Sequence, residues 1–415
     1  MEIWSDGVLE CCVPDPSITP LFSFLLSGAT PMKRSTDRIL VSHVGSLARP
    51  RDLMEMLVAR NEGKPFDAEA LARRTREAVA DVVEKQIECG IDIVNDGELG
   101  KSNFSRYTKE RLGGFIERPA GADFKPTSIF GRDMLEFTEY FNRGGRTSIG
   151  HHARVFYCVE PLTYIGQEEV KADITNLKSA LQGKQLEEGF LPAVAPGTME
   201  HWMKNEYYKT QEEYLFAISA AMAEEYRAIV DAGFVLQIDD PDLADAWQMH
   251  PQMTTVEYRK YQELRIEALN HGLKGLPEDR IRFHMCWGSY HGPHKYDIPL
   301  NEIVDLVLKV RAGCYSIEAS NPCHEHEWRV WEGVKLPDDK LLMPGVIGHY
   351  SDFIEHPRAI ADRLIRYAKI VGRENVIAGS DCGIGSRVGH PQVGWAKFQA
   401  MAEGARIASR ELWAA

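Results

Sequence analysis

The chain has 415 residues, of which 44% are hydrophobic and 26% are charged, and its formal net charge at pH 7 is −13. This length suits one (β/α)8 barrel with insertions, so the size does not require two domains. The acidic balance provides no electrostatic attraction for nucleic acid or for an anionic membrane surface, so we expect neither as a partner.

Residues 1–38 are predicted to be an N-terminal extension that precedes the barrel. Their apolar patch at residues 18–26 is much shorter than a membrane span. The stretch before the patch is acidic, with Glu2 and Asp6, whereas a secretory signal would be basic there. We interpret the extension as disordered or as a mis-assigned start, with Met32 as an alternative initiator.

From residue 39 onward, short apolar runs alternate with amphipathic segments, which predicts βα units around a parallel sheet. We therefore expect one α/β domain over residues 39–415, a (β/α)8 TIM barrel. Nine runs are candidate strands, at residues 39–46, 91–98, 154–162, 190–197, 234–241, 280–288, 314–320, 341–348 and 375–383. Because the barrel has eight strands, one run is surplus, and we select 190–197. Helices are expected at residues 68–89, 211–232, 254–271, 302–312, 358–371 and 394–412.

Residues 100–150 interrupt this alternation with polar and glycine-rich sequence, including the pair Gly113 and Gly114 and the pair Gly144 and Gly145. We predict a long excursion after the second strand. Long insertions in barrels often carry function at the active face, so the excursion is expected to lie over that face.

Four potential metal ligands lie toward the ends of three predicted strands. His284 and Cys286 share one face of their strand, because side chains two residues apart in a strand point the same way. Glu318 and Cys382 end two later runs, and barrel enzymes gather their chemistry at the C-terminal ends of their strands. A nitrogen, two thiolates and a carboxylate suit zinc, so we predict one zinc site from these four residues.

The cysteines give a prediction of compartment. Eight cysteines are scattered through the chain, at positions 11, 12, 89, 158, 286, 314, 323 and 382. Such scattered usage in a long chain is typical of a reducing compartment, unlike the dense pattern of a disulfide framework. We therefore predict a cytoplasmic protein.

Seven predicted strands end in polar or glycine-containing tips, which in chain order are HVGS, DGE, DDP, HMCWG, EAS, GVIG and DCG. With these motifs the chain resembles the catalytic half of cobalamin-independent methionine synthase and its single-domain relatives, which include epoxyalkane:coenzyme M transferase. The resemblance extends from about Ile39 to Trp413. It implies a TIM barrel with a catalytic zinc that activates a thiol for alkylation, as in methionine biosynthesis.

The resemblance also assigns roles by position. In methionine synthases, the residues that match Ser46, Glu98 and Asp239 hold the amino acid part of homocysteine. We predict that His43 also binds the substrate. The implied zinc ligands are His284, Cys286, Glu318 and Cys382.

The reaction also needs a proton donor, because an N5-methyl folate loses a poor amine leaving group and an opening epoxide develops an alkoxide. The candidate acids are His349, Tyr350, Asp240 and His43. We place His349 first and regard Asp240 as the second catalytic residue. The histidine that follows GVI in methionine synthases stands one position later, where this chain has Tyr350.

Each predicted residue also has a purely structural explanation. Free cysteines are most often buried thiols, and Asp239 and Asp240 could simply cap the following helix. Four zinc-type donors at three strand ends nevertheless favour metal binding. A second cluster, CHEHE at residues 323–327, is expected to be solvated and not to bind a second metal. His291 and His294, in the loop after the His284 strand, are expected to line the substrate.

The predicted function is that of a zinc-dependent thiol alkyltransferase, nominally methyl transfer from a 5-methyltetrahydrofolate-type donor to homocysteine to form methionine. One alternative is alkylation of another thiol, such as coenzyme M by an epoxide, and the single-barrel length favours it. Further alternatives are a zinc-free enzyme like uroporphyrinogen decarboxylase and a non-catalytic thiol or metal carrier. The expected partners are a small-molecule thiol and an alkyl donor.

Overall fold

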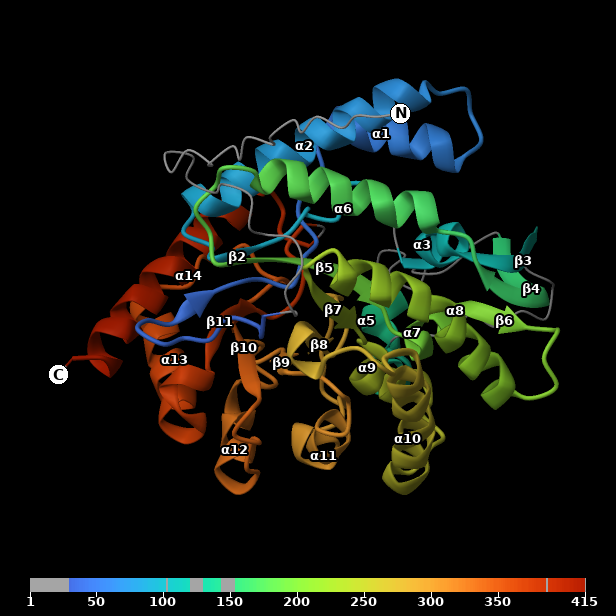
Figure 1. The fold of residues 1–415 in the computed structure, drawn as a ribbon. Coiled ribbons are helices and arrows are strands. Elements are labelled where there is room, and N and C mark those ends of the chain that lie inside the picture. Colours follow the sequence, from blue (N-terminus) through green and yellow to red (C-terminus); the bar gives the residue numbers. More distant parts are fainter. Residues whose placement is uncertain (1–29, 102–103, 120–129, 143–153, 386, 415) are drawn as a thin grey trace, which may run out of the picture. The chain divides into compact units, whose positions relative to one another are not determined.

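Eight parallel strands form the central sheet of the protein (Figure 1). The computed structural model describes residues 30–101, 104–119, 130–142, 154–385 and 387–414. Their order in the sheet is β1-β11-β10-β9-β8-β7-β5-β2. A 2.9 Å hydrogen bond from the Asp92 amide to the Val41 carbonyl links the two ends of this order, so the sheet nearly closes and the predicted TIM barrel is confirmed. The barrel strands are β1 Leu40–Val41, β2 Ile93–Val94, β5 Glu188–Val194, β7 Val235–Asp239, β8 Ile281–Met285, β9 Cys314–Ile317, β10 Leu341–Ile347 and β11 Ile377–Ser380. A separate three-stranded sheet contains β3 Leu112–Pro119, β4 Arg154–Tyr164 and β6 Met203–Asn205.

Helices connect the strands and surround the barrel (Figure 1). Side chains cap the starts of some helices: the Asp67 side chain accepts from the Ala70 amide at the start of α2, and Thr254 and Glu257 form a capping box at α10. The helix predicted at 302–312 is reduced to one turn, α11. No helix within the described ranges is both long and apolar enough to span a bilayer. The helices are α1 Arg51–Asn61, α2 Ala68–Glu88, α3 Phe104–Arg111, α4 Gly131–Glu136, α5 Thr138–Asn142, α6 Gln167–Leu181, α7 Pro196–Trp202, α8 Gln211–Asp231, α9 Asp242–Met249, α10 Thr255–Gly272, α11 Val304–Val307, α12 Val330–Gly333, α13 Pro357–Val371 and α14 Pro391–Leu412.

The prediction that residues 190–197 are the surplus run is wrong. β5 pairs in parallel with β2 and with β7, so it is the third strand of the barrel. The surplus run is 154–162, because β4 pairs with β3 and β6 in the separate sheet. Six of the seven β5 residues are buried, as in a strand covered on both faces, whereas β4 exposes Glu160 and Pro161.

The long segment between β2 and β5 is anchored beside α9 by Arg132 of α4. This side chain donates to the carbonyl oxygens of Trp247 and His250 at 2.6 and 2.9 Å. Its guanidinium carbon lies 3.3 Å from the centroid of the Trp247 ring. Parts of residues 100–150 lie outside the described ranges, so their position over the active face stays a prediction.

The chain enters the barrel at the end where the strands begin. Met32, within the predicted extension, is buried in the interior core together with Phe190 and Val235. Residues 31–38 therefore already contribute to barrel packing. The rest of the extension, residues 1–29, lies outside the described residues, and the alternative start at Met32 stays a prediction.

The barrel interior changes from apolar to polar along β7 and β8. Val235 belongs to the apolar interior core. Gln237 and Arg282, which are paired in register, follow as a buried polar layer. Asp239 and His284, also paired, come next at the C-terminal ends of the strands. Polar side chains therefore collect at the end of the barrel where we predict the chemistry.

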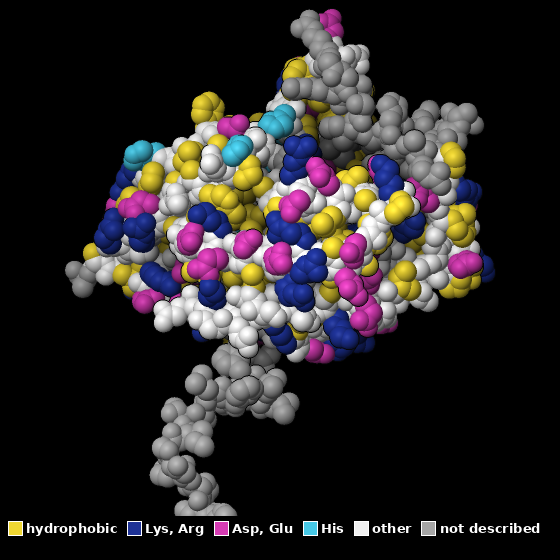
Figure 2. Space-filling model, turned by 90° about the horizontal axis from the view of Figure 1, so that it is seen from above, with side chains coloured by type: hydrophobic (Ala, Val, Ile, Leu, Met, Phe, Trp, Pro, Cys, Tyr) yellow, Lys and Arg dark blue, Asp and Glu magenta, His cyan; other side chains and the backbone are white. Residues whose placement is uncertain are grey.

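Figure 2 shows the face that carries α1 and α2, where acidic and basic side chains are interspersed. Two pairs illustrate the pattern: Arg74 with Asp52 at 2.6 Å, and Arg51 with Glu55 at 2.9 Å. Because both signs are mixed, this face presents no broad field of one sign to a charged partner.

Candidate active site

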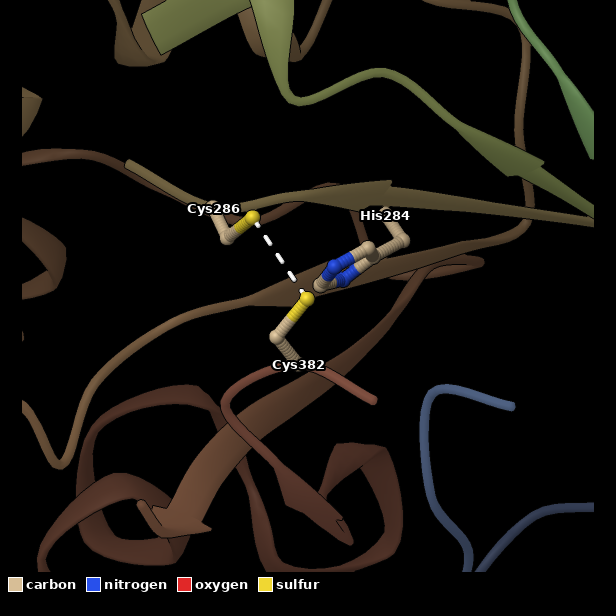
Figure 3. A group of neighbouring side chains, drawn as sticks. All are labelled: His284, Cys286 and Cys382. Atoms are coloured by element: carbon tan, nitrogen blue, oxygen red, sulfur yellow. Dashed lines mark hydrogen bonds between the residues drawn. The ribbon is translucent and has the colours of Figure 1, made fainter. Parts of the chain in front are cut away.

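Three of the four predicted zinc ligands converge at the C-terminal end of the barrel (Figure 3). His284 is in β8, Cys286 follows that strand directly, and Cys382 follows β11. One donor atom from each lies within 4.8 Å of those of the other two. The two sulfurs are 3.7 Å apart. Strand alternation aims the first two side chains into one space, and β11 brings the third to them from across the sheet.

The imidazole of His284 is arranged as a metal ligand would be. Its Nδ1 atom lies 3.2 Å from the Ser316 hydroxyl of β9, which fixes the ring. Its Nε2 atom is buried and has no hydrogen-bond partner among the described residues. A buried, unpaired polar atom costs on the order of 1–3 kcal/mol, a cost that a bound ion would remove. This nitrogen and two adjacent sulfurs fit zinc.

Glu318, the fourth predicted ligand, lies beside the other three without joining their group. Its Oε2 atom accepts a 2.8 Å hydrogen bond from the amide of Trp287, the neighbour of Cys286. Its Oε1 atom accepts from the Asn321 side chain at 2.9 Å. Glu318 groups instead with His349 and Asp381, within the same 4.8 Å limit.

The pKa values of the two cysteines are shifted in opposite directions. The hydrogen bond from the Cys286 thiol, opposed by burial and reinforced by His284, holds the pKa of Cys382 well below its ordinary value. The Ser289 hydroxyl donates to the same sulfur at 3.2 Å. Burial would lower the pKa of His284, but the interaction with Cys382 outweighs it and raises this pKa. The thiolate form is therefore favoured at Cys382 over Cys286, whose pKa is raised.

The residues predicted to bind the amino acid part of homocysteine surround these donors. Ser46 lies against Gly383, where an added Cβ would come within 2.7 Å of the serine Cβ. A Cβ on Gly45, whose φ is +140°, would come within 2.8 Å of Glu98 Oε1. Burial raises the pKa of Asp239 to about 7, with His284 lowering it and Glu98 raising it. The glycines thus leave room for two polar side chains near the donors.

Glu98 itself adopts a left-handed backbone conformation, with φ of +56°. This region is uncommon for residues other than glycine and costs roughly 1 kcal/mol or more. Arg49 supports it by donating to the carbonyl oxygens of Glu98 and Lys101, each at 2.7 Å. Burial raises the pKa of Glu98, while the charges of Lys101 and Arg49 oppose that rise.

His349, the first candidate acid, is buried between two carboxylates. Both of its ring nitrogens lack hydrogen-bond partners among the described residues, although Glu318 and Asp381 are close. Asp381 is held by the amides of Ala319 and Ser320, each at 2.9 Å. The imidazole can therefore hold a proton that is not committed to a structural hydrogen bond.

Two other candidate acids, His43 and Asp240, each have a hydrogen-bond partner. His43 Nε2 lies 2.7 Å from the Gln86 side chain, and burial lowers the pKa of His43 to about 3. Asp240 accepts a 3.0 Å hydrogen bond from the Thr198 hydroxyl, and burial raises its pKa to about 6. Neither contact involves a predicted zinc ligand, so the roles of His43 and Asp240 rest on the sequence.

Comparison with models of known protein families finds no match. The methionine synthase of Thermococcus kodakarensis is 24% identical over 374 residues, which cover 89% of this chain and 94% of that protein. The methionine synthase of Saccharolobus solfataricus is 23% identical over 372 residues, with the same coverage. This chain is a relative of the methionine synthases. The resemblance inferred from the strand-end motifs is confirmed.

The fold of this methionine synthase relative also matches a solved structure. A B12-independent methionine synthase from Shewanella sp. W3-18-1, solved in complex with selenomethionine, superimposes with a TM-score of 0.70. The match covers 91% of this chain and 100% of that chain at 22% sequence identity. At this identity the likeness supports the fold alone.

Two residues of the CHEHE cluster of this chain, His324 and Glu327, belong to a buried network of ion pairs. His324 bridges Glu327 and Asp297, at 2.9 and 3.1 Å. His294 contacts the same Asp297 at 2.6 Å. The prediction that this cluster is solvated is wrong, because His324 and Glu327 are buried. His294, expected to line the substrate, is also buried and paired.

Some residues of the site were not predicted from the sequence. Ser316 of β9 orients His284 and lies two positions before Glu318, which directly follows that strand, so strand alternation could have identified it. Asp381 belongs to the DCG tip and Ser289 to no such motif, but neither was predicted, because their contacts depend on how the loops after β8 and β11 fold.

Proposed function

We propose that this protein is a zinc-dependent methyltransferase that transfers a methyl group from a 5-methyltetrahydrofolate-type donor to the thiol of homocysteine, forming methionine. The observation that carries the proposal is the convergence of His284, Cys286 and Cys382 beside Asp239 and Glu98. Relatives named methionine synthase, aligned over nearly their whole length, support the reaction class.

His284, Cys286 and Cys382 would hold the zinc, with Glu318 as the proposed fourth ligand. A bound zinc would supply Lewis acidity, so that a substrate thiol ionises at neutral pH yet stays nucleophilic. The chain favours this chemistry itself, because the pKa of Cys382 is held well below its ordinary value and the Ser289 hydroxyl donates to its sulfur.

Glu98 and Asp239 are the proposed partners of the α-ammonium group of homocysteine, and Ser46 is the proposed partner of its carboxylate. Both acidic side chains have raised pKa values because they are buried. An ammonium group placed between them would favour their ionised forms and offset part of the desolvation cost. Substrate recognition and carboxylate ionisation would therefore be coupled.

His349 is the proposed acid for the departing amine of the donor, and Asp240 is the second candidate. His349 is preferred because its ring nitrogens have no hydrogen-bond partner among the described residues, whereas Asp240 is bonded to Thr198.

The six described cysteines are free thiols, which supports the proposed cytoplasmic location.

The proposal is tested by mass spectrometry of the products formed by zinc-loaded protein. Homocysteine with methyltetrahydrofolate is expected to yield methionine, and removal of zinc with a chelator is expected to abolish the yield. Coenzyme M with epoxypropane serves as the parallel reaction. Turnover of that pair, with none of homocysteine, would replace the proposed substrates, and full activity without metal would reject the zinc dependence.

A further inference from the structure

One buried arginine crosses the barrel beneath the candidate active site. Arg282 lies on β8, which is four strands from β1 in either direction around the sheet. Its Nη1 and Nη2 atoms nevertheless reach the segment directly after β1, donating to the Ser42 hydroxyl at 2.9 Å and the His43 carbonyl at 3.1 Å. The guanidinium stacks on the Phe190 ring, with its carbon 3.9 Å from the centroid. The side chain therefore spans the full interior.

The same guanidinium determines how the Gln237 side chain is turned. Arg282 Nε donates to Gln237 Oε1 at 2.7 Å. Because a guanidinium has donors only, the glutamine must present its oxygen to the arginine. Its Nε2 group then faces the other way and donates to Asp239 Oδ1 at 2.7 Å and to the Val44 carbonyl. The orientation of Gln237 is thus imposed by Arg282.

The inside of a TIM barrel is usually filled by branched apolar side chains, so this polar layer is unusual. Burying a guanidinium is expensive unless every donor finds an acceptor, and replacing such a group by an apolar one is often neutral or stabilising. Arg282 is 1% exposed and Gln237 is fully buried. A requirement other than stability is therefore the better explanation for the layer.

We propose that Arg282 and Gln237 are positioning residues that hold the carboxylate of Asp239 in place to receive an ammonium group, and so set specificity for α-amino-acid thiols. The proposal rests on the proposed function, which supplies the amino acid substrate. The hydrogen bond from Gln237 fixes one carboxylate oxygen of Asp239 and leaves the other for the ligand. Without that bond, the carboxylate can turn away from Glu98 and the site loses its preformed geometry.

Two variants remove this arrangement in different ways. Arg282→Lys keeps the positive charge but loses the planar fork that orients Gln237. Gln237→Met keeps the side-chain length but loses the donor to Asp239. The matched control is Arg280→Lys, because Arg280 precedes β8 directly, is buried, and pairs with Glu188. Circular dichroism establishes that each variant is folded, and Gln237→Met decides the question if Arg282→Lys does not fold.

Calorimetric titration of the zinc-loaded protein compares L-methionine with 4-(methylthio)butanoate, which lacks the amino group. The wild-type protein is expected to prefer methionine. Both site variants are expected to raise the Kd of methionine about tenfold or more, which corresponds to the loss of roughly one charged hydrogen bond. They are expected to leave the Kd of the analogue within about twofold of the wild-type value. Arg280→Lys is expected to change neither value.

The other outcomes overturn the inference. An equal loss of affinity for both ligands would make the layer merely structural, and unchanged affinity for both would remove its role. A wild-type protein without preference for methionine would reject the amino acid substrate of the proposed function, and the inference with it. That result is recognised before any variant is measured, so the two failures are distinguishable.

Discussion

At the scale of single residues, His349→Gln is expected to separate chemistry from binding. The imidazole lies buried beside Glu318 and Asp381 with no hydrogen-bond partner among the described residues, so its loss removes a proton donor more than a structural contact. We expect kcat to fall about 100-fold or more, with little change in the KM for homocysteine or in zinc content. Steady-state kinetics and metal analysis measure these quantities.

Tyr350→Phe is the control for His349, because Tyr350 is the neighbouring candidate acid. Its hydroxyl donates to the Ser320 carbonyl at 3.3 Å. The variant is expected to retain kcat within about threefold, since a single neutral hydrogen bond is lost. A large fall in Tyr350→Phe, with none in His349→Gln, would move the acid to Tyr350.

A second prediction concerns the room that Gly45 leaves for Glu98. Gly45→Ala places a Cβ within 2.8 Å of Glu98 Oε1, so the carboxylate must move, and we expect the KM for homocysteine to rise about tenfold. Gly233→Ala is the matched control, because Gly233 also has positive φ but nothing lies within 4 Å of its added Cβ. Equal effects of the two variants on KM would show that backbone strain, and not Glu98, is responsible.

The ligand assignment predicts loss of metal in two variants. His284→Ala and Cys382→Ser each remove one member of the converging group, and both are expected to lose zinc and activity together. Cys89→Ser is the control, since that buried cysteine lies at the end of α2. Elemental analysis after gel filtration gives the zinc content, and full zinc in either site variant would contradict the assignment.

At the scale of elements, a neutral histidine joins the segment directly after β1 to α2. His43 is buried between the Phe190 and Phe398 rings and bonds to Gln86. Burial lowers the pKa of His43 to about 3, below the value of about 6.5 expected in the unfolded chain. The unfolded chain therefore binds the proton first, and stability is lost as the pH falls below about 6.5 toward 3.

This linkage is measured by urea unfolding between pH 7 and pH 4. The contribution of His43 is expected to reduce the free energy of unfolding by about 1.4 kcal/mol for each pH unit between the two pKa values. His43→Gln removes the titrating group, so the pH dependence should become shallower by about that slope. An unchanged pH dependence would contradict the buried neutral histidine.

Element by element, the sequence predicted most of the barrel strands. The alternation that placed His284 and Cys286 on one face is present in β8. The selection of 190–197 as the surplus run was wrong. Both 154–162 and 190–197 are apolar runs of similar length, but residues 190–195 include no polar residue, as expected of a strand covered on both faces, whereas 154–162 includes Arg154 and Glu160.

At the scale of the whole molecule, the order of strand-end motifs predicted the TIM barrel and the relationship to methionine synthases. The barrel brings His284, Cys286 and Cys382 together from distant parts of the chain. The sequence did not reveal the layer beneath them, because the contacts of Arg282 with Ser42 and His43 join residues about 240 positions apart. Such contacts follow from closure of the barrel and leave no local pattern.

We propose that His284, Cys286 and Cys382 hold one zinc ion, and zinc K-edge X-ray absorption of the loaded protein measures its ligands. We expect one zinc per chain, with two sulfur ligands from Cys286 and Cys382 and lighter donors that include a histidine nitrogen. A spectrum with no sulfur in the coordination shell, or a protein that retains no stoichiometric zinc, would contradict it.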